Sequence, residues 1–228
     1  MGKTILVTGA NRGIGLEISK QLLALGHTVI LAGRDADALN AAKRSLDQSV
    51  DAHILQMDVC DDESVFDAYN KVKSKHKKLD VLINNAGILP DQHDTTDVTV
   101  KAMKKTMETN MYGPLRTSQT FLDLLYKSDE SRIINVSSGM GAFSEMMGSY
   151  AVYRISKTAL NSLTAVMSFD LNNAIKVVAV SPGWVQTDMG GASAPRTVEE
   201  GASGIVDLAT RKFLESGKFY RDGEQISW

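Results

Sequence analysis

The sequence predicts a single doubly wound α/β domain with a mostly parallel sheet of about seven strands and helices on both faces. Short apolar segments alternate with longer amphipathic segments along nearly all of the 228 residues. Most of the short segments are continuously apolar, which is typical of strands buried on both faces of a parallel sheet. No linker, low-complexity segment or internal repeat divides residues 1–228, so we expect one domain.

The first elements form a strand–turn–helix–strand unit. An apolar β-type run at residues 4–7 leads into a glycine-rich turn at 8–15. Apolar residues then recur at helical spacing and stop at Gly26, and a strand is predicted over 28–32. This order and length are those of a βαβ unit.

The same alternation continues through the rest of the chain. Acidic residues at 61–63 suit a helix N-terminus, and Gly113-Pro114 predicts a bend in the longest helix. The predicted helices are 36–46, 62–74, 99–125, 150–171 and 198–214, and the predicted strands are 52–57, 79–83, 132–136, 175–180 and 219–226.

Composition excludes several classes of function. The chain has 43% hydrophobic and 23% charged residues, and its formal net charge of -2 offers no basic surface for nucleic acid. A single cysteine, Cys60, excludes an intramolecular disulfide framework. No apolar run reaches the length of a membrane span, and no signal peptide is recognised. We therefore expect a cytoplasmic protein without nucleic-acid or membrane partners.

Every unusual cluster of residues follows a predicted strand. Because parallel strands end at the same edge of an open sheet, these clusters should gather there, where such sheets bind ligands. The clusters are residues 8–15, 33–34, 58–59, 84–87, 137–138 and 182–189.

The turn at residues 8–15 has the properties of a diphosphate-binding loop. Gly9 permits a tight turn, Gly13 lets the backbone approach a phosphate, and Gly15 lets the helix lie close to the sheet. The N–H groups at the start of the helix then favour an anion. Its glycine spacing differs from G-x-G-x-x-G, and a glycine-rich helix entry without a ligand is the structural alternative.

The residues after the second strand favour NADP(H) over NAD(H). An NAD site usually has a carboxylate there for the ribose 2′-hydroxyl, whereas this strand ends in Ala-Gly-Arg. Arg34 suits a 2′-phosphate, Arg12 adds a second cation, and Asp35 is expected to begin the next helix. Ordinary surface charges are the alternative for both arginines.

Two interpretations of Asp58-Val59 remain equally open. Asp58 can accept a hydrogen bond from the adenine amino group, with the Val59 N–H on the ring, or it can be the N-cap of the helix that begins near Asp62. The neighbouring Cys60 is expected to be an inert small residue.

Tyr153 and Lys157 lie one helical turn apart, which predicts a proton-transfer pair. A nearby ammonium lowers the pKa of a phenol, and a tuned phenol can protonate a carbonyl oxygen during reduction. The spacing alone is weak evidence of catalysis, because Tyr69 and Lys73 share it in a charged helix that suggests only a structural role.

Together these residues resemble the short-chain dehydrogenase/reductase family and, within it, the carbonyl reductases. The resemblance implies a Rossmann-like domain and an oxidoreductase. The family likeness rests on residues 8–15, Asn84-Asn85-Ala86-Gly87, Asn110, Ser138, Tyr153 with Lys157, and Pro182-Gly183 with Thr187; the narrower likeness rests on residues 8–16, 183–189 and Trp228.

The resemblance implies a role for each matched residue. Tyr153 would be the general acid/base, Lys157 would lower its pKa and bind the nicotinamide ribose, and Ser138 would polarise the carbonyl. Asn110 would hold a water that links Lys157 to solvent, and Thr187 would bind the carboxamide. A serine turn and a buried helix-bending amide are the structural alternatives for Ser138 and Asn110. The implied cofactor-binding residues are Gly9, Asn11, Arg12, Gly13, Ile14, Gly15, Arg34, Asp58, Val59, Asn85, Ala86, Gly87, Tyr153, Lys157, Pro182, Gly183, Val185 and Thr187.

Two departures from the family pattern have consequences. The gap from Ser138 to Tyr153 exceeds the usual one, which leaves open whether Ser137 or Ser138 faces the substrate. The long insertion that animal carbonyl reductases carry before the tyrosine is missing, so helices 99–125 and 150–171 are free to pack against another subunit. We expect a homodimer or homotetramer.

The segments near the site suggest the substrate. Residues 188–200 are expected to form a flexible lid. Methionine and phenylalanine side chains between Ser138 and Tyr153 suggest an apolar pocket for a small hydrophobic aldehyde, ketone or quinone, although they also suit subunit packing. The alternatives are an NADP-dependent secondary alcohol or hydroxysteroid dehydrogenase, and a catalytically silent NADPH-binding sensor or scaffold. No metal site is predicted.

Overall fold

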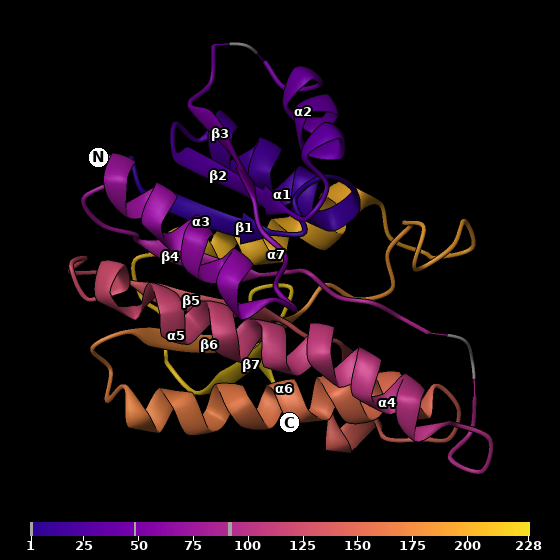
Figure 1. The fold of residues 1–228 in the computed structure, drawn as a ribbon. Coiled ribbons are helices and arrows are strands. Elements are labelled where there is room, and N and C mark those ends of the chain that lie inside the picture. Colours follow the sequence, from indigo (N-terminus) through magenta and orange to yellow (C-terminus); the bar gives the residue numbers. More distant parts are fainter. Residues whose placement is uncertain (1, 48, 91–92) are drawn as a thin grey trace.

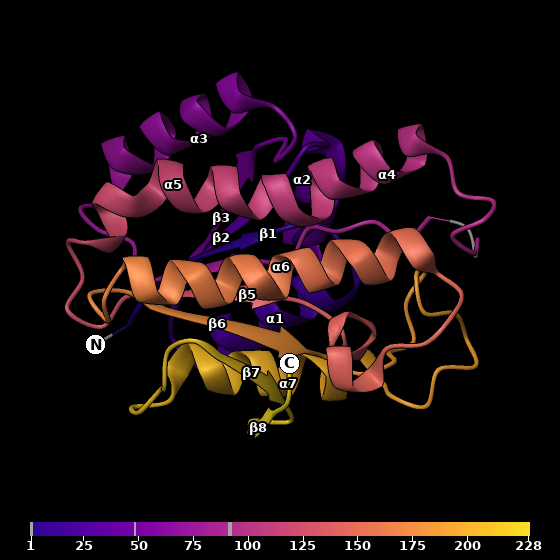
Figure 2. The ribbon, with the colours of Figure 1, turned by 90° about the horizontal axis from the view of Figure 1, so that it is seen from below.

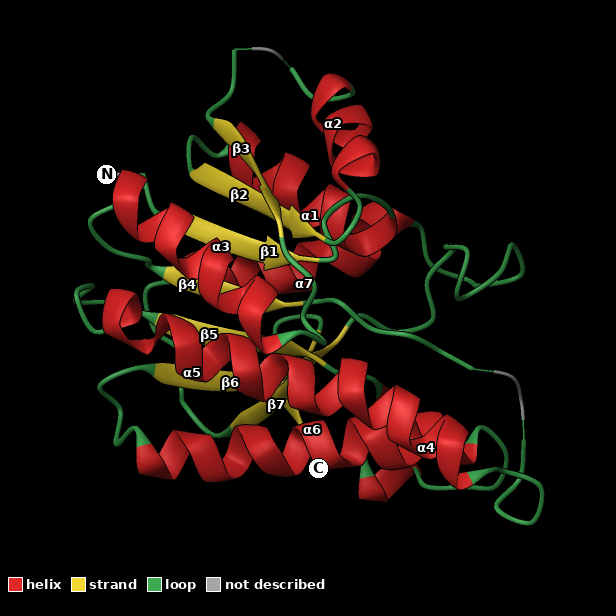
Figure 3. Ribbon diagram, viewed as in Figure 1, coloured by secondary structure: helices red, strands yellow, loops and turns green. Residues whose placement is uncertain are grey.

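The computed structural model describes residues 2–47, 49–90 and 93–228 and confirms the α/β class (Figures 1 and 3). Within these residues a single eight-stranded sheet has the order β3-β2-β1-β4-β5-β6-β7-β8. Its strands are β1 (Thr4–Thr8), β2 (Thr28–Gly33), β3 (Ala52–Gln56), β4 (Val81–Asn84), β5 (Arg132–Val136), β6 (Lys176–Ser181), β7 (Lys218–Arg221) and β8 (Glu224–Ile226).

Helices cover both faces of the sheet. The helices are α1 (Gly13–Ala24), α2 (Ala36–Arg44), α3 (Asp62–Lys75), α4 (Val100–Met107), α5 (Gly113–Leu125), α6 (Ala151–Asp170) and α7 (Val198–Thr210). α1, α2 and α7 pack on one face, and α3, α5 and α6 pack on the other. None of the helices in the described part of the chain is both long enough and apolar enough to cross a bilayer.

Successive side chains of β1 pack into the hydrophobic cores on opposite faces of the sheet. Ile5 and Val7 belong to the cluster that packs under α1 and α7, whereas Leu6 belongs to the cluster under α3 and α5. All three side chains are fully buried. A continuous apolar run is required because successive side chains of a strand point to opposite faces, and both faces are covered here.

The sheet differs from the prediction at its C-terminal edge. The strand predicted over 219–226 is a hairpin, in which β7 pairs parallel to β6 and β8 pairs antiparallel to β7. Asp222 and Gly223 form the turn, and both have positive φ, which the tightest hairpin turns require. This hairpin accounts for the eighth strand.

The long helix predicted over 99–125 is interrupted. α4 ends at Met107, a π-helical turn runs over Glu108–Tyr112, and α5 begins at Gly113. The interruption therefore lies before the predicted Gly113-Pro114. α7 also ends at Thr210, four residues earlier than the predicted 214.

The strand order reverses beside β1, which pairs with β2 on one side and with β4 on the other. The connections after β1 and β4 thus leave in opposite directions at the carboxyl edge of the sheet. Open α/β sheets bind ligands in the crevice at such a point.

Candidate active site

The glycine-rich turn after β1 is shaped as the sequence predicts. Gly9 has a φ of +63°, and a Cβ on Gly15 would lie 2.3 Å from the Gly9 carbonyl oxygen. Only glycine at position 15 allows α1 to approach the turn this closely. Residues on the β4 side hold the turn, since the Asn85 side-chain amide donates to the carbonyl oxygen of Thr8 at 2.9 Å.

The N-terminus of α1 has the properties of an anion site. Its N-cap, Arg12, makes no side-chain capping bond, and the first turn contains no acidic residue. The first backbone bond of the helix runs from the Leu16 N–H to the Arg12 carbonyl oxygen. The three preceding N–H groups therefore have no helical partner, and the residues present fit a bound diphosphate.

The two arginines predicted to meet a 2′-phosphate lie in different environments. Arg34 is exposed at the end of β2 and lines a cavity of about 330 Å³ with Gln56, Asp58, Ser64, Asp67 and Lys71. Asp35 begins α2 as predicted, and its carboxylate caps the helix by accepting from the Ala38 N–H. Arg12 forms an exposed ion pair with Asp188.

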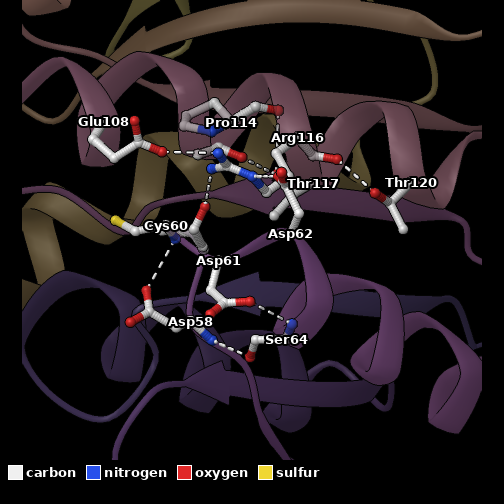
Figure 4. Close-up of polar contacts among 12 residues, drawn as sticks. Asp58, Cys60, Asp61, Asp62, Ser64, Glu108, Pro114, Arg116, Thr117 and Thr120 are labelled. Atoms are coloured by element: carbon white, nitrogen blue, oxygen red, sulfur yellow. Dashed lines mark hydrogen bonds and ion pairs between the residues drawn. The ribbon is translucent and has the colours of Figure 1, made fainter.

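Asp58 is not the N-cap of α3, so that interpretation was wrong (Figure 4). Asp61 has that role, and its carboxylate accepts from the Ser64 N–H at 2.8 Å. Asp58 instead accepts from the Cys60 N–H at 2.9 Å, in its own turn. Its contact with adenine remains a prediction. Burial raises the pKa of the Cys60 thiol, which agrees with an inert residue.

Tyr153 and Lys157 lie together on the first turns of α6, both nearly fully buried. The Lys157 ammonium nitrogen is 5.6 Å from the centre of the Tyr153 ring and donates to the Val136 carbonyl oxygen at 2.8 Å. The Ser138 hydroxyl lies near the tyrosine hydroxyl and lowers its pKa slightly against the effect of burial. Among the described residues, no carboxylate forms an ion pair with Lys157.

Burial dominates the protonation of this pair. Burial raises the pKa of Tyr153 to about 12 and lowers the pKa of Lys157 to about 8. The Ser138 hydroxyl has a smaller effect, which lowers the pKa of Tyr153. The expected lowering of the Tyr153 pKa by Lys157 is therefore absent here. The physical reason is that removal from water penalises the charged form of both groups, and the ammonium is directed to a carbonyl of β5.

The structure distinguishes the two adjacent serines, Ser137 and Ser138. Ser137 is 2% exposed, and its hydroxyl donates to the Asn161 side-chain oxygen at 2.6 Å. Ser138 is half-buried and caps a short 3-10 turn by accepting from the Met140 N–H, while its hydroxyl also meets Tyr153. Of the two serines, Ser138 is the one whose hydroxyl lies near Tyr153.

Asn110 lies fully buried in the π-helical turn. Its side-chain oxygen accepts from the Ile88 N–H at 2.8 Å, and its amide donates to the Ile88 carbonyl oxygen at 2.9 Å and the Ser156 hydroxyl at 3.0 Å. A Cβ on Gly87 would lie 3.4 Å from the Asn110 oxygen and 3.5 Å from the Lys157 nitrogen. The glycine thus leaves a small space beside both polar groups.

The segment after β6 lies over the glycine turn. The Thr187 methyl group is 3.5 Å from the Cβ position of Gly13, and Gly183 has a φ of +79°. Val185 pairs with Arg196 in an isolated bridge. Residues 198–200, predicted as part of the lid, instead form the first turn of α7, because Thr197 and Glu200 make a capping box there.

The second tyrosine–lysine pair is a natural comparison. The Tyr69 hydroxyl donates to the Asp123 carboxylate at 2.6 Å and accepts from the Lys73 ammonium at 2.8 Å. Its phenol is therefore held between two charged groups on α3 and α5, in agreement with a structural role.

Two contributors were not singled out from the sequence. The Thr8 hydroxyl accepts from the N–H groups of Asn85 and Ala86, both at 3.0 Å, and Ser156 anchors Asn110. The position of Thr8 directly before Gly9 could have indicated that its hydroxyl helps to hold the glycine turn. The role of Ser156 depends on a contact across 46 residues, which local patterns do not reveal.

The sequence and the fold match known proteins. A family model described as short chain dehydrogenase matches residues 3–197. The structure is similar to NADPH-bound carbonyl reductase from chicken fatty liver, with TM-score 0.91, 34% identity and coverage of 100% and 99% of the two chains. It is also similar to the carbonyl reductase Sniffer of D. melanogaster, with TM-score 0.91, 32% identity and 100% coverage of both chains. The sequence is 32% identical to (+)-neomenthol dehydrogenase of Arabidopsis thaliana, over 94% of each chain.

Proposed function

Since this chain belongs to the short-chain dehydrogenase family, we propose that it uses NADPH to reduce a small hydrophobic aldehyde, ketone or quinone. Bound NADPH supplies the hydride. The observation that carries the proposal is that half-buried Ser138 lies with buried Tyr153 and Lys157 at the carboxyl edge of the sheet. A lysine that is 4% exposed and lacks a carboxylate partner among the described residues lowers stability, so a functional role is favoured.

Tyr153 suits the part of general acid. With its pKa raised to about 12, its hydroxyl is protonated at neutral pH and can give its proton to the substrate oxygen as the carbonyl carbon becomes an alcohol carbon. Ser138 lies near the same hydroxyl and can donate to the developing oxyanion. The two hydroxyls thus converge on one oxygen atom of the substrate.

Lys157 suits the part of proton supplier to Tyr153. Its pKa of about 8 lies near neutral pH, so it exchanges protons readily under ordinary conditions. The space beside Gly87, between Lys157 and Asn110, supports a proton path from solvent toward the ammonium. In this proposal Asn110 orients a water there.

Four features support NADPH as the cofactor. The free N–H groups of α1 suit a diphosphate, and exposed Arg34 lies where a 2′-phosphate would be expected. Asp35, the nearest acid after β2, is engaged as an N-cap. The chicken liver relative, 34% identical, carries NADPH in its structure.

The substrate class follows from the surroundings of Ser138. Met140 is half-buried beside it, and the following apolar side chains are exposed, with Phe143 at 71% and Met147 at 69%. Such flexible apolar side chains suit a small hydrophobic carbonyl compound, and two solved relatives are carbonyl reductases. We propose that the segment from Asp188 to Thr197 closes over it as a lid.

A panel of aldehydes, ketones and quinones, followed by the loss of NADPH absorbance, tests the proposal. We expect turnover with at least one class, and a loss of roughly 10²–10⁴-fold in kcat for Tyr153→Phe. Tyr69→Phe is the matched control, because it removes the phenol of the other tyrosine–lysine pair, and it should keep full activity. NADPH binding without turnover on the whole panel would contradict the proposal and favour a sensor or scaffold.

Oxidation of a secondary alcohol in the same site is the second candidate. The observation in its favour is the similarity to (+)-neomenthol dehydrogenase, over 94% of each chain. Faster turnover of secondary alcohols with NADP⁺ than of carbonyls with NADPH, measured on matched substrate pairs, would select it.

A further inference from the structure

Arg116 connects the loop after β3 to the π-helical turn that carries Asn110. It lies on α5, and its side chain is 18% exposed. The guanidinium donates to the Val59 carbonyl oxygen at 2.6 Å and to the Glu108 carboxylate at 2.8 Å, and it also pairs with Asp62 (Figure 4). No part of the function proposed above uses this residue.

One of the two segments is the loop after β3. Arg116 holds the carbonyl group of Val59 there, directly after Asp58, and holds the first residue of α3, Asp62. We take this loop to receive the adenine of the NADPH that the proposed function requires, as predicted for Asp58 and Val59. Because the guanidinium presents several donors in a rigid plane, it can fix the backbone and both carboxylates at once.

The other segment is the π-helical turn that carries Asn110. Arg116 reaches it through Glu108, and two further contacts join the same parts. The Cys60 sulfur lies 3.3 Å from the Thr109 hydroxyl, and a Cβ on Gly113 would lie 3.0 Å from a methyl group of Val59. The loop and the turn are therefore packed together, with the guanidinium as their charged link.

We propose that Arg116 is a positioning residue that couples the adenine loop to the turn holding Asn110. The inference rests on the proposed function, because it assumes that the loop binds adenine and that Asn110 serves Lys157. Ordering of Val59 by the cofactor is transmitted through the guanidinium to Glu108, and so to the turn whose Asn110 bonds Ile88 and Ser156. The alternative is an ordinary ion pair that adds only stability.

The test measures amide hydrogen exchange with and without saturating NADPH, together with NADPH affinity. In the native protein we expect NADPH to slow exchange at the glycine turn, residues 9–15, and at the π-helical turn, residues 108–112. Arg116→Met should keep the first effect at saturation and lose the second. Its Kd for NADPH should rise about tenfold, in the range set by the loss of one charge-assisted hydrogen bond.

Two further variants separate coupling from stability. Lys127→Met removes a cation beside α5 that pairs with Asp123 at 3.6 Å but is not bonded to the loop, and it should keep both exchange effects. Arg116→Lys keeps the charge without the planar fork, and its exchange protection at 108–112 should be intermediate. In steady-state kinetics Arg116→Met should lower kcat while the KM for the carbonyl stays unchanged.

The outcomes distinguish this inference from the proposed function. If Arg116→Met retains NADPH-dependent protection at 108–112, or loses only thermal stability, the coupling is wrong and the reductase proposal stands. If NADPH leaves exchange at 9–15 unchanged in the native protein, both proposals are wrong. Should Arg116→Met fail to fold, unaltered protection in Arg116→Lys would overturn the coupling.

Discussion

The Lys157 ammonium donates a hydrogen bond of 2.8 Å to the Val136 carbonyl oxygen at the end of β5. This bond anchors α6 to the sheet at the position where the proposed chemistry takes place. It also satisfies only one of the three donors of a buried ammonium, and the pKa of Lys157 falls to about 8 as a result of burial. The protein thus keeps a group near Tyr153 that is easily deprotonated.

Lys157→Met should make the protein more stable while abolishing its activity. At neutral pH the lowered pKa corresponds to a penalty of roughly 3 kcal/mol, and loss of the bond to Val136 offsets about 1 kcal/mol. We expect a gain of about 2 kcal/mol in the free energy of unfolding, measured by urea denaturation. Lower stability of the variant at pH 7 would contradict this view.

The free energies of unfolding of the native protein and of Lys157→Met should also differ in their dependence on pH. Between pH 8 and pH 10.5 the unfolded chain holds a proton on Lys157 that the folded chain has lost, so native stability rises with pH across this window. The variant lacks this contribution, and the two denaturation free energies should converge by about pH 10. The raised pKa of Tyr153 changes the free energy of unfolding only above pH 10.0, the ordinary pKa of tyrosine. It does so equally in the native protein and in Lys157→Met.

Alanine substitution at the two adjacent serines should have different effects. Ser138→Ala removes the hydroxyl that lies near Tyr153, and we expect kcat to fall roughly 10²-fold. Ser137→Ala leaves the oxygen of Asn161 without its donor and should cost about 1–3 kcal/mol of stability. Steady-state kinetics and thermal melting on both variants check this, and similar behaviour of the two would refute the assignment of Ser138.

Arg34→Asp should weaken NADPH binding far more than NADH binding. The substitution removes a charge-assisted contact with the 2′-phosphate and places a carboxylate there that repels it. We therefore expect the Kd for NADPH to increase roughly 10²-fold. The control is Arg44→Asp, which makes the same charge change at the exposed end of α2. Fluorescence titration measures both cofactors, and equal losses for NADPH and NADH would rule out the assignment.

Exposed apolar side chains on α6 and at the end of α5 favour the predicted homodimer or homotetramer, and these two helices lie side by side (Figures 1 and 2). Phe169 is 83% exposed and Val166 is 58% exposed on α6, and Tyr126 at the end of α5 is 54% exposed. We expect light scattering to report a dimer or tetramer at micromolar concentration, and Val166→Glu with Phe169→Glu to give monomers. Phe213→Glu, at a residue 82% exposed beyond α7, should leave the oligomer intact. A monomeric native protein would contradict the prediction.

The sequence by itself was sufficient for the features that depend on neighbouring residues. Continuous apolar runs such as residues 4–7 predicted buried strands, and glycine spacing predicted the turn before α1. The clusters after successive strands predicted a site at one edge of the sheet. These signals are local because backbone sterics and the burial of both strand faces act within a few residues.

Tertiary structure decided the features that depend on distant partners. Asn110 lies in a π-helical turn where a single helix bent at Gly113-Pro114 was predicted, and its side chain bonds Ile88 and Ser156 across 22 and 46 residues. Ser137 bonds Asn161 across 24 residues, which leaves Ser138 to face Tyr153. The protonation of Tyr153 and Lys157 was also decided there, since desolvation depends on everything packed around a group and their spacing in the sequence records only that they share a helix face.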